Sequence, residues 1–559
     1  MEGLEELEQL TIEQYLSFSS ESEYSGDDTQ SKVDIEVPQG KVLLHMFTNR
    51  HLRLRDNTAL YQALAHNPDK FYAVYIMEGL DSIAVAPIRW KFMIDCMEDL
   101  KYQLLEYGLE VYFLSGESSS ILSTLINQWK ITHLSINMDP DVNFISYNEK
   151  INKICQENNI QMFTDLESHR LLWLPNTYKD PISMTKFRAL LAEAITAKQN
   201  NTCSEAYIQT VIPDLNEDQL IELGKKERIP CPFISEIPQL RNLFPNTAFS
   251  QLTFLFQGGE RYINNIFLNE YREARLRHTP VEEISPIKAK AKPISPYLRF
   301  GCITPRKFFQ FLVDLINNSN YSRINIDQAL AGIIARDFAL QASQKQPIPE
   351  RIISYNNLCL PIPWDRNSNL IQSFNAAQTG FPFFDAAIIQ IKTEGYAVNE
   401  VTESLATFVT NGLLWISWEE GLELFYLNSV NFDLPISTYS WLEASSSTMI
   451  SGLQKQYKDP MLYVSRQIDP NGDYIKKYIP KLRDFPLEYI HKPDLAPIEV
   501  QQAANCIIGV DYPKPLFEYT SRQDKCCKRM KVFMEVVDTA AHAQALPHVV
   551  EGCKGRFPT

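Results

Sequence analysis

The sequence predicts an α/β domain with a doubly wound parallel sheet on the N-terminal side, followed by a large all-α domain. Two observations predict this architecture. Short apolar runs alternate with helical segments between residues 41 and 165, as in a parallel sheet covered by helices on both faces. From residue 214 onward, apolar residues recur at three- and four-residue steps, which is the period of α-helices.

The apolar runs on the N-terminal side are the expected strands. They are KVLLHMF (41–47), FYAVYIM (71–77), VYFLSG (111–116), HLSINMD (133–139) and IQMFTD (160–165). Helical segments such as WKFMIDCMEDLKYQLLEYG (90–108) separate them. No Gly-x-Gly-x-x-Gly pattern follows the first run, so a dinucleotide site of the Rossmann type is unsupported.

Composition sets the expected boundaries of five parts. Acidic, Ser-rich residues at the start predict a disordered leader, and a polar, Pro-containing stretch predicts a linker between the domains. After the helical domain, one amphipathic helix and a frayed tail are expected. The parts are the leader 1–40, the α/β domain 41–169, the linker 170–213, the helical domain 214–515 and the C-terminal helix and tail 516–559.

Charge and cysteine usage limit the classes of function. The net charge of −15 disfavours non-specific binding to nucleic acid, so DNA binding is expected to be weak or absent. The ten cysteines show no metal-binding or disulfide-framework spacing, which favours a reduced, intracellular setting. The acidic N-terminus shows no signal peptide, and no uncharged apolar run approaches about 18 residues, so no membrane association is expected.

Aromatic residues are concentrated between Trp364 and Ser447. Four of the seven tryptophans of the chain lie there. No histidine occurs between His278 and His491, which disfavours acid/base or metal chemistry based on imidazole in this region. The pattern favours a bound aromatic cofactor beside a chain of oxidisable side chains.

Five separated motifs resemble the photolyase/cryptochrome family. In chain order they are FTNRHLRLRDNTAL (47–60), ISPYLRFGCITPR (294–306), TGFPFFDAA (379–387), ISWEEG (416–421) and DPNGDYIKKYIPKLRDFP (469–486). The run CIIGVDYP (506–513) and the three serines after Trp441 resemble most the insect type I cryptochromes. The resemblance implies that the helical domain is of the FAD-binding type and that RLRDN joins the domains; a solvent-facing turn is the alternative for RLRDN.

The resemblance implies electron-transfer roles for the tryptophans. Trp441, Trp418 and Trp364 match the triad of the family, and Trp415 matches an additional outer position. Because Trp415 and Trp418 are three residues apart, we expect them to share one helix face. The structural alternative is that these large aromatic side chains fill a helical core.

The flavin contacts implied by the resemblance are partly eroded. Pro293 removes a backbone donor from the phosphate loop, where Lys292 could still attract phosphate. Thr402 and Asn431 stand where the family pairs an arginine with an aspartate, so weak or substoichiometric FAD is expected. The retained candidates, for which an ordinary helix cap or surface contact is the alternative, are Ser295, Arg336, Asn399, Asp433 and Ser437.

The residues implied in DNA repair are not matched. Gly332, Ala335 and Glu443 stand where photolyases hold a flipped base with a glutamate and two tryptophans, and Val398 stands in place of a histidine proton donor. No enzymatic activity is therefore expected. The favoured hypothesis is a blue-light receptor of the circadian system, cytoplasmic and nuclear, in which a mobile C-terminal segment releases or docks a clock or signalling protein. A flavin-poor interaction scaffold and a DNA photolyase are the alternatives, and no residue identifies an antenna pigment.

Overall fold

The computed structural model describes most of the chain between Gly40 and His542. The described residues are 40–78, 86–139, 145–165, 169–174, 184–200, 207–277, 292–316, 318–344, 359–360, 362–448 and 461–542. The leader expected before Gly40 and the tail expected after His542 lie outside them.

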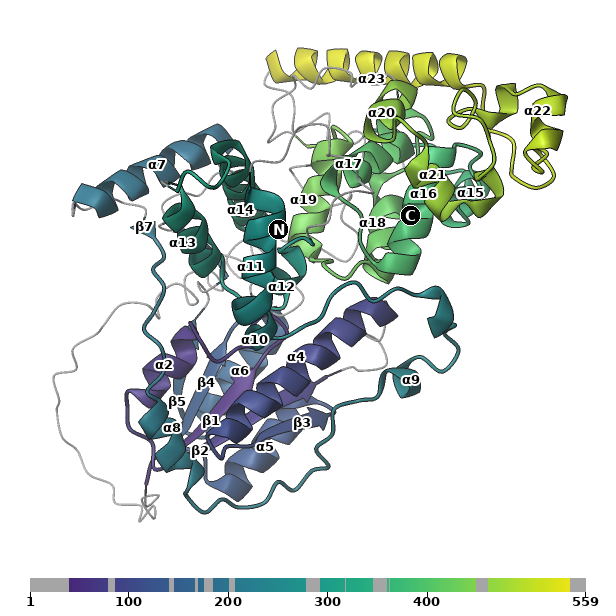
Figure 1. Cartoon of the computed structure of the whole chain (residues 1–559). Coiled ribbons are helices and arrows are strands. Elements are labelled where there is room, and N and C mark those ends of the chain that lie inside the picture. Colours follow the sequence, from purple (N-terminus) through teal and green to yellow (C-terminus); the bar gives the residue numbers. More distant parts are fainter. Residues whose placement is uncertain are drawn as a thin grey trace, which may run out of the picture. The chain divides into compact units, whose positions relative to one another are not determined.

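The N-terminal sheet has five parallel strands, and all five predicted strands are confirmed (Figure 1). The strand order is β3-β2-β1-β4-β5, so the direction of winding reverses at β1. In the register of the sheet, Val42 pairs with Lys70 and Leu43 with His133. The strands are β1 Val42–Phe47, β2 Lys70–Met77, β3 Val111–Ser115, β4 His133–Asn137 and β5 Gln161–Asp165.

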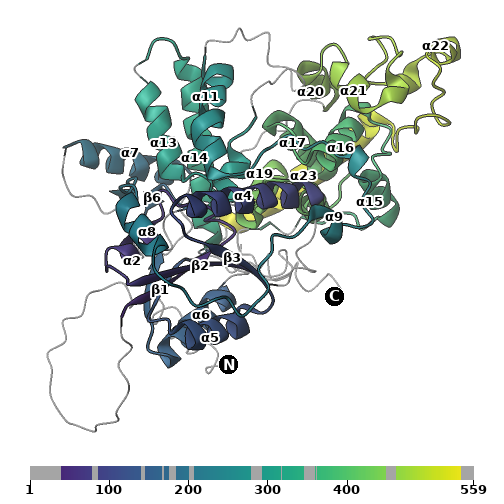
Figure 2. The same ribbon diagram turned by 60° about the horizontal axis from the view of Figure 1, so that its bottom comes forward.

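Helices cover both faces of this sheet because alternate strand residues point to opposite sides. Leu44 and Met46 pack on the side of α5 and α6, whereas Leu43 and Phe47 pack on the side of α4. Figure 2 shows α4 and α5 on opposite sides of the strands. The helices of this domain are α2 Thr58–Leu64, α4 Pro87–Glu106, α5 Ser118–Trp129 and α6 Ile145–Glu157.

The predicted linker 170–213 contains regular structure. It holds a two-stranded antiparallel ladder, β6 Leu172–Trp173 and β7 Tyr207–Ile208, and the 17-residue helix α7 Met184–Asn200. Phe187 of α7 packs edge-on against Phe338 of the helical domain, with ring centroids 5.5 Å apart. The linker was predicted from the prolines and polar residues that flank this helix, whereas residues 184–200 themselves carry buried apolar side chains at helical steps.

The segment after the linker lies along the α/β domain, although we expected the helical domain to begin at Asp214. The amide of Phe113 donates to Ser235 Oγ at 2.9 Å, and the Phe113 carbonyl accepts from the amide of Glu236 at 3.0 Å. These bonds pair the backbone groups of Phe113 at the open edge of β3. The segment contains α8 Glu217–Gly224, α9 Leu240–Leu243 and the 3₁₀ turn η3 Phe249–Gln251.

The rest of the described chain is helical, as predicted, with three π-helical turns among the α-helices. Its elements are α10 Glu260–Tyr262, η4 Ile263–Phe267, α11 Leu268–Tyr271, η5 Arg272–Leu276, α12 Ser295–Arg299, α13 Pro305–Leu315, α14 Arg323–Gln344, α15 Ser368–Asn375, α16 Pro382–Glu394, α17 Asn399–Thr407, η7 Phe408–Gly412, α18 Trp418–Asn428, α19 Leu434–Ala444, α20 Met461–Ile468, α21 Asp473–Tyr478, η8 Pro480–Leu482, η9 Pro493–Leu495, α22 Ile498–Ala503 and α23 Tyr519–His542.

The predicted C-terminal helix is confirmed as α23. Its buried residues Cys526, Met530 and Val537 recur at helical steps and pack with Trp415. Within the described ranges, no helix is both long and apolar enough to span a bilayer.

Candidate functional site

The four tryptophans fall into two groups. Trp418 begins α18 and Trp441 lies in α19, and both belong to the main apolar core of the helical domain. Trp364 and Trp415 lie in connecting segments and pack together beneath α23, with ring centroids 5.2 Å apart. The structure therefore places two of the predicted electron-transfer residues in the main core and two in a smaller apolar cluster beneath α23.

The predicted shared helix face of Trp415 and Trp418 is wrong. The π-turn η7 ends at Gly412, and the chain from Leu413 to Ser417 is irregular before α18 begins. Trp415 has a left-handed backbone with φ of 59°, which is unusual for a bulky residue. The three-residue spacing misled because helical periodicity continues in the sequence across a break in the helix.

A glycine lets Trp441 approach α18 closely. A Cβ atom at Gly421 would lie 2.0 Å from Trp441 Cη2, so any larger residue would displace the ring. Trp418 is fully buried, and its indole N–H faces the sulfur of Cys359. No nitrogen or oxygen of the described residues accepts that N–H.

Asp433, predicted to contact flavin, is held by an arginine from the α/β domain. Arg50 donates to both carboxylate oxygens of Asp433, at 2.5 and 3.0 Å, and its Nε donates to Asp139 at 2.7 Å. Burial alone would raise the pKa of Asp433, but the guanidinium of Arg50 outweighs it and lowers the pKa to about 2. The carboxylate is therefore ionised and held by a bidentate partner.

Three further candidates also have partners within the protein. Ser295 Oγ accepts from Asn431 Nδ2 at 2.9 Å, and Ser437 Oγ accepts from the amide of Asp433 at 3.3 Å. Arg336 donates to the carbonyl oxygens of His169 and Leu298, at 3.0 and 3.4 Å.

The remaining positions of the predicted flavin site are less engaged. Asn399 is exposed at the start of α17, and Thr402 Oγ1 donates to the Asn399 carbonyl at 3.0 Å. Lys292 is partly buried, and Ala291, with the rest of the predicted phosphate loop before it, lies outside the described residues.

The fold brings two imidazoles near Arg50, which sequence reasoning missed. His51 and His169 are buried, and both interact electrostatically with Arg50, the partner of Asp433. Burial, followed by the neighbouring guanidiniums, lowers the pKa of His169 well below its usual value, so the ring is neutral. No histidine occurs between His278 and His491, but that observation covers only one stretch of the sequence. His51 and His169 come from the N-terminal part of the chain, and the fold places them beside Arg50.

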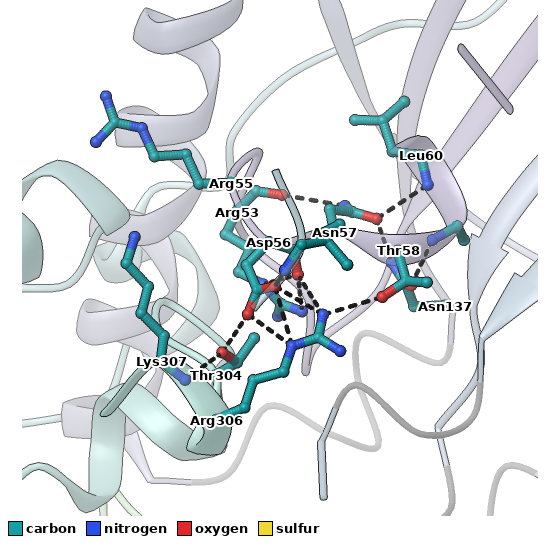
Figure 3. Close-up of polar contacts among 12 residues, drawn as sticks. Arg53, Arg55, Asp56, Asn57, Thr58, Leu60, Asn137, Thr304, Arg306 and Lys307 are labelled. Atoms are coloured by element: carbon teal, nitrogen blue, oxygen red, sulfur yellow. Dashed lines mark hydrogen bonds and ion pairs between the residues drawn. The ribbon is translucent and has the colours of Figure 1, made fainter. Parts of the chain in front are cut away.

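The loop Arg53–Thr58 joins the two domains, so the solvent-facing alternative for RLRDN is wrong (Figure 3). Arg306 Nε donates to the Asp56 carboxylate at 2.9 Å, and Thr304 Oγ1 donates to the same group. The amides of Leu54 and Arg55 donate to Glu260 at 2.7 and 3.1 Å. Asp56 and Glu260 are both buried.

A glycine on the helical side lets the two backbones meet. Gly301 has φ of 64°, and a Cβ atom there would lie 1.6 Å from the Arg50 carbonyl oxygen. Arg53 Nη1 donates to the Gly301 carbonyl at 3.0 Å. The motif FTNRHLRLRDNTAL therefore supplies a polar, buried joint rather than surface charge.

The positions implied in DNA repair come from two packed helices, α14 and α19. Gly332 is exposed, and a Cβ atom there would meet no described atom within 4 Å. Ala335 and Glu443 are partly buried. Val398 packs at the edge of the helical core immediately before α17.

Comparison with protein families decides the identity of the fold. Residues 44–198 match the family model for DNA photolyase, and residues 329–532 match the model for the FAD binding domain of DNA photolyase. The chain belongs to the photolyase/cryptochrome family. Its N-terminal sheet domain and helical C-terminal domain are those of that family.

The family members most similar in sequence include vertebrate cryptochromes. Cryptochrome-2 of Gallus gallus is 29% identical over 87% of this chain and 82% of its own, and Cryptochrome-1 of Mus musculus is 29% identical over 87% and 79%. A Synechocystis cryptochrome structure matches with TM-score 0.69 at 20% identity, over 87% of this chain and 99% of its own. A class III photolyase of Agrobacterium tumefaciens matches with TM-score 0.69 at 19% identity, over 90% and 100%.

The helical domain retains a polar group that suits a bound cofactor of the FAD type. Thr438 on α19 is buried, and its hydroxyl has no hydrogen-bond partner in the part of the chain that the structure describes. Buried polar groups normally have partners, so this hydroxyl is available to a bound group. Thr438 lies within the segment that matches the FAD binding domain.

Proposed function

We propose that this protein is a flavin-dependent blue-light receptor of the cryptochrome type, close to the light-sensing insect branch, which acts in circadian control through protein partners. The observation that carries the proposal is the placement of four tryptophans in a domain that matches an FAD binding domain. Trp418 and Trp441 lie in its core, and Trp364 lies at its edge, partly open to solvent.

FAD, when bound, supplies the light-absorbing and electron-accepting ring. Ser295, Arg336, Asn399, Asp433 and Ser437 would hold it. Four of these already bond within the protein, so FAD would share these groups with their present partners. Since each loss of about 1.4 kcal/mol weakens affinity tenfold, we expect weak or substoichiometric FAD.

The tryptophans would move positive charge away from the cofactor. Indole is among the few side chains that a photoexcited flavin can oxidise. Trp441 and Trp418 are buried and Trp364 is partly exposed, so charge that moves from Trp441 through Trp418 to Trp364 would travel from the core to the surface. Trp415 is the additional outer position beside Trp364.

The C-terminal helix would transmit the signal. Charge created in a low-dielectric site changes nearby interactions strongly, and α23 packs directly on Trp415. A change at this contact would release or dock a clock or signalling protein in the cytoplasm and nucleus.

DNA repair is not part of the proposal. At Gly332 there is open space in place of a stacking side chain, and Glu443 would repel phosphate. The net charge of −15 also opposes DNA binding.

A specific observation favours a second candidate, a flavin-poor cryptochrome that serves as an interaction scaffold. Arg50 binds both oxygens of Asp433, and Asn431 binds Ser295, so these groups have partners within the protein itself. Under this alternative the same partners would bind in darkness and in light.

Visible absorbance and flavin content of the purified protein test the proposal. A flavin spectrum that bleaches in blue light supports the receptor, and a colourless, folded protein supports the scaffold. The double change Thr402→Arg with Asn431→Asp should raise occupancy more than either single change, because only the double variant forms an ion pair. Repair of pyrimidine dimers by the purified protein would instead support a photolyase.

A further inference from the structure

The helix α23 places positive charge directly over Trp415. The guanidinium carbon of Arg529 lies 4.4 Å from the centre of the Trp415 ring. Arg522 donates to the carbonyl oxygens of Leu413 and Leu414, at 2.9 and 2.8 Å. Asp365 pairs with Arg529 at 2.9 Å and with Arg522 at 3.4 Å, so one carboxylate faces two guanidiniums.

Trp415 and its neighbour Trp364 have different surroundings. Trp415 is fully buried, whereas Trp364 is partly exposed. The indole N–H of Trp415 donates to the carbonyl oxygen of Pro363 at 2.9 Å. A carbonyl oxygen accepts a hydrogen bond but does not take the proton, so an oxidised Trp415 would remain a cation.

We propose that Arg529 is a positioning residue that makes Trp415 the harder of the two indoles to oxidise, so that positive charge rests on Trp364. The inference rests on the proposed function and deepens it. One electron leaves the tryptophan pair toward a one-electron oxidant, the photoexcited flavin in the receptor. Trp364 then loses its indole proton to water, and a neutral radical remains at the edge of the domain.

Electrostatics supports the proposal that Trp415 is harder to oxidise than Trp364. A guanidinium over an aromatic face is attractive while the ring is neutral, and it becomes repulsive once the ring is a cation. Asp365 offsets one of the two positive charges, and the burial of Trp415 leaves little solvent to screen the other. The left-handed backbone of Trp415 shows that the chain accepts strain to hold this ring beneath α23.

The test oxidises the full-length protein without relying on its flavin. Photogenerated tris(bipyridine)ruthenium(III) supplies the oxidant, and peptide mass spectrometry measures how the oxygenated product divides between Trp364 and Trp415. Arg529→Met removes the charge but keeps an unbranched side chain, and Arg529→Lys keeps the charge. Lys528→Gln removes an equal charge from the exposed side of α23 as a matched control.

We expect the share of product at Trp415 to rise about tenfold in Arg529→Met and to stay near the native value in Arg529→Lys and Lys528→Gln. Asp365→Asn should lower the share, because it removes the offsetting anion. If Arg529→Met and Asp365→Asn merely undocked α23, both would expose Trp415 and raise its share. Undocking therefore could not produce a rise in one variant and a fall in the other. Equal shares in the Met and Lys variants, or a rise in Asp365→Asn, would overturn the inference. A flavin-free preparation would defeat the proposed function while leaving this measurement intact.

Discussion

Two buried aspartates in the helical region are held in opposite ways. Asp385 accepts hydrogen bonds from neutral donors, the amides of Thr379 and Gly380 at 3.0 and 3.1 Å and the hydroxyl of Tyr512 at 2.5 Å. Asp433 is held by the charged side chain of Arg50 from the other domain. Burial raises the pKa of Asp385 despite its donors, whereas Arg50 overcomes burial at Asp433 and lowers the pKa to about 2.

The difference separates two tasks that buried carboxylates perform. Asp385 fixes the turn before α16 and ties it to the segment near Tyr512, so it organises one region of the helical domain. Asp433 joins two domains through a charge, and the pairing costs desolvation of both partners. A neutral donor set tolerates loss of one member better than a buried ion pair does.

Breaking the charged joint should have the largest effect. Arg50→Ala leaves Asp433 and Asp139 buried without their shared cation, so we expect a loss of about 3–5 kcal/mol in the free energy of unfolding. Urea denaturation measures it. Arg55→Ala, an exposed arginine in the same loop, is the matched control and should change stability by less than about 0.5 kcal/mol.

The double variant Arg50→Met with Asp433→Asn sharpens the same comparison. It removes both charges, so the loss should be smaller than the sum of the two single losses. Strict additivity would show that Arg50 and Asp433 do not stabilise each other.

Sequence separation explains which parts of the structure were predictable. The five strands and α23 follow from local periodicity, and Asp385 binds donors five and six residues before it. Arg50 and Asp433 are separated by 383 residues, so no local pattern could pair them. Local periodicity also misled at Trp415, where a π-turn and an irregular segment interrupt the helix. The partners of Asp433 required the fold.

Glu260 provides an intermediate case, because it lies at the domain joint but is held by backbone amides like Asp385. Burial raises its pKa to about 7, against the opposing effect of the Leu54 amide. A raised carboxyl pKa stabilises the folded state below about pH 4.5, and this stability is lost as the pH rises toward 7.

Glu260→Gln should therefore flatten the dependence of stability on pH between about 4.5 and 7 by an amount of order 2–3 kcal/mol. The glutamine also lowers stability by the same amount at every pH, because its NH2 group faces a backbone N–H donor. The quantity to measure is therefore the slope of stability against pH. An unchanged slope in thermal unfolding across this range would show that Glu260 does not titrate there.

Asp385→Asn tests the neutral donor set. The amide oxygen can still accept from part of the set, so we expect a loss of about 1–2 kcal/mol. Tyr512→Phe removes one donor and should cost less than the asparagine variant. A loss at Asp385 as large as that for Arg50→Ala would remove the distinction between neutral and charged partners.

Trp418 should show the smallest effect, because it is buried without a polar bond to lose. Its ring is fully buried in the helical core, and its N–H has no nitrogen or oxygen acceptor among the described residues. Phenylalanine fills much of the same space, so Trp418→Phe should cost under about 1.5 kcal/mol in urea denaturation. Trp415→Phe is the matched comparison, because it loses the hydrogen bond to Pro363 and should cost more.

Phenylalanine is also much harder to oxidise than tryptophan, so Trp418→Phe should sharply slow photoreduction of bound flavin while the protein stays folded. Unchanged photoreduction in the folded variant would remove Trp418 from the electron path. Packing of the core would then be the only role left for this side chain.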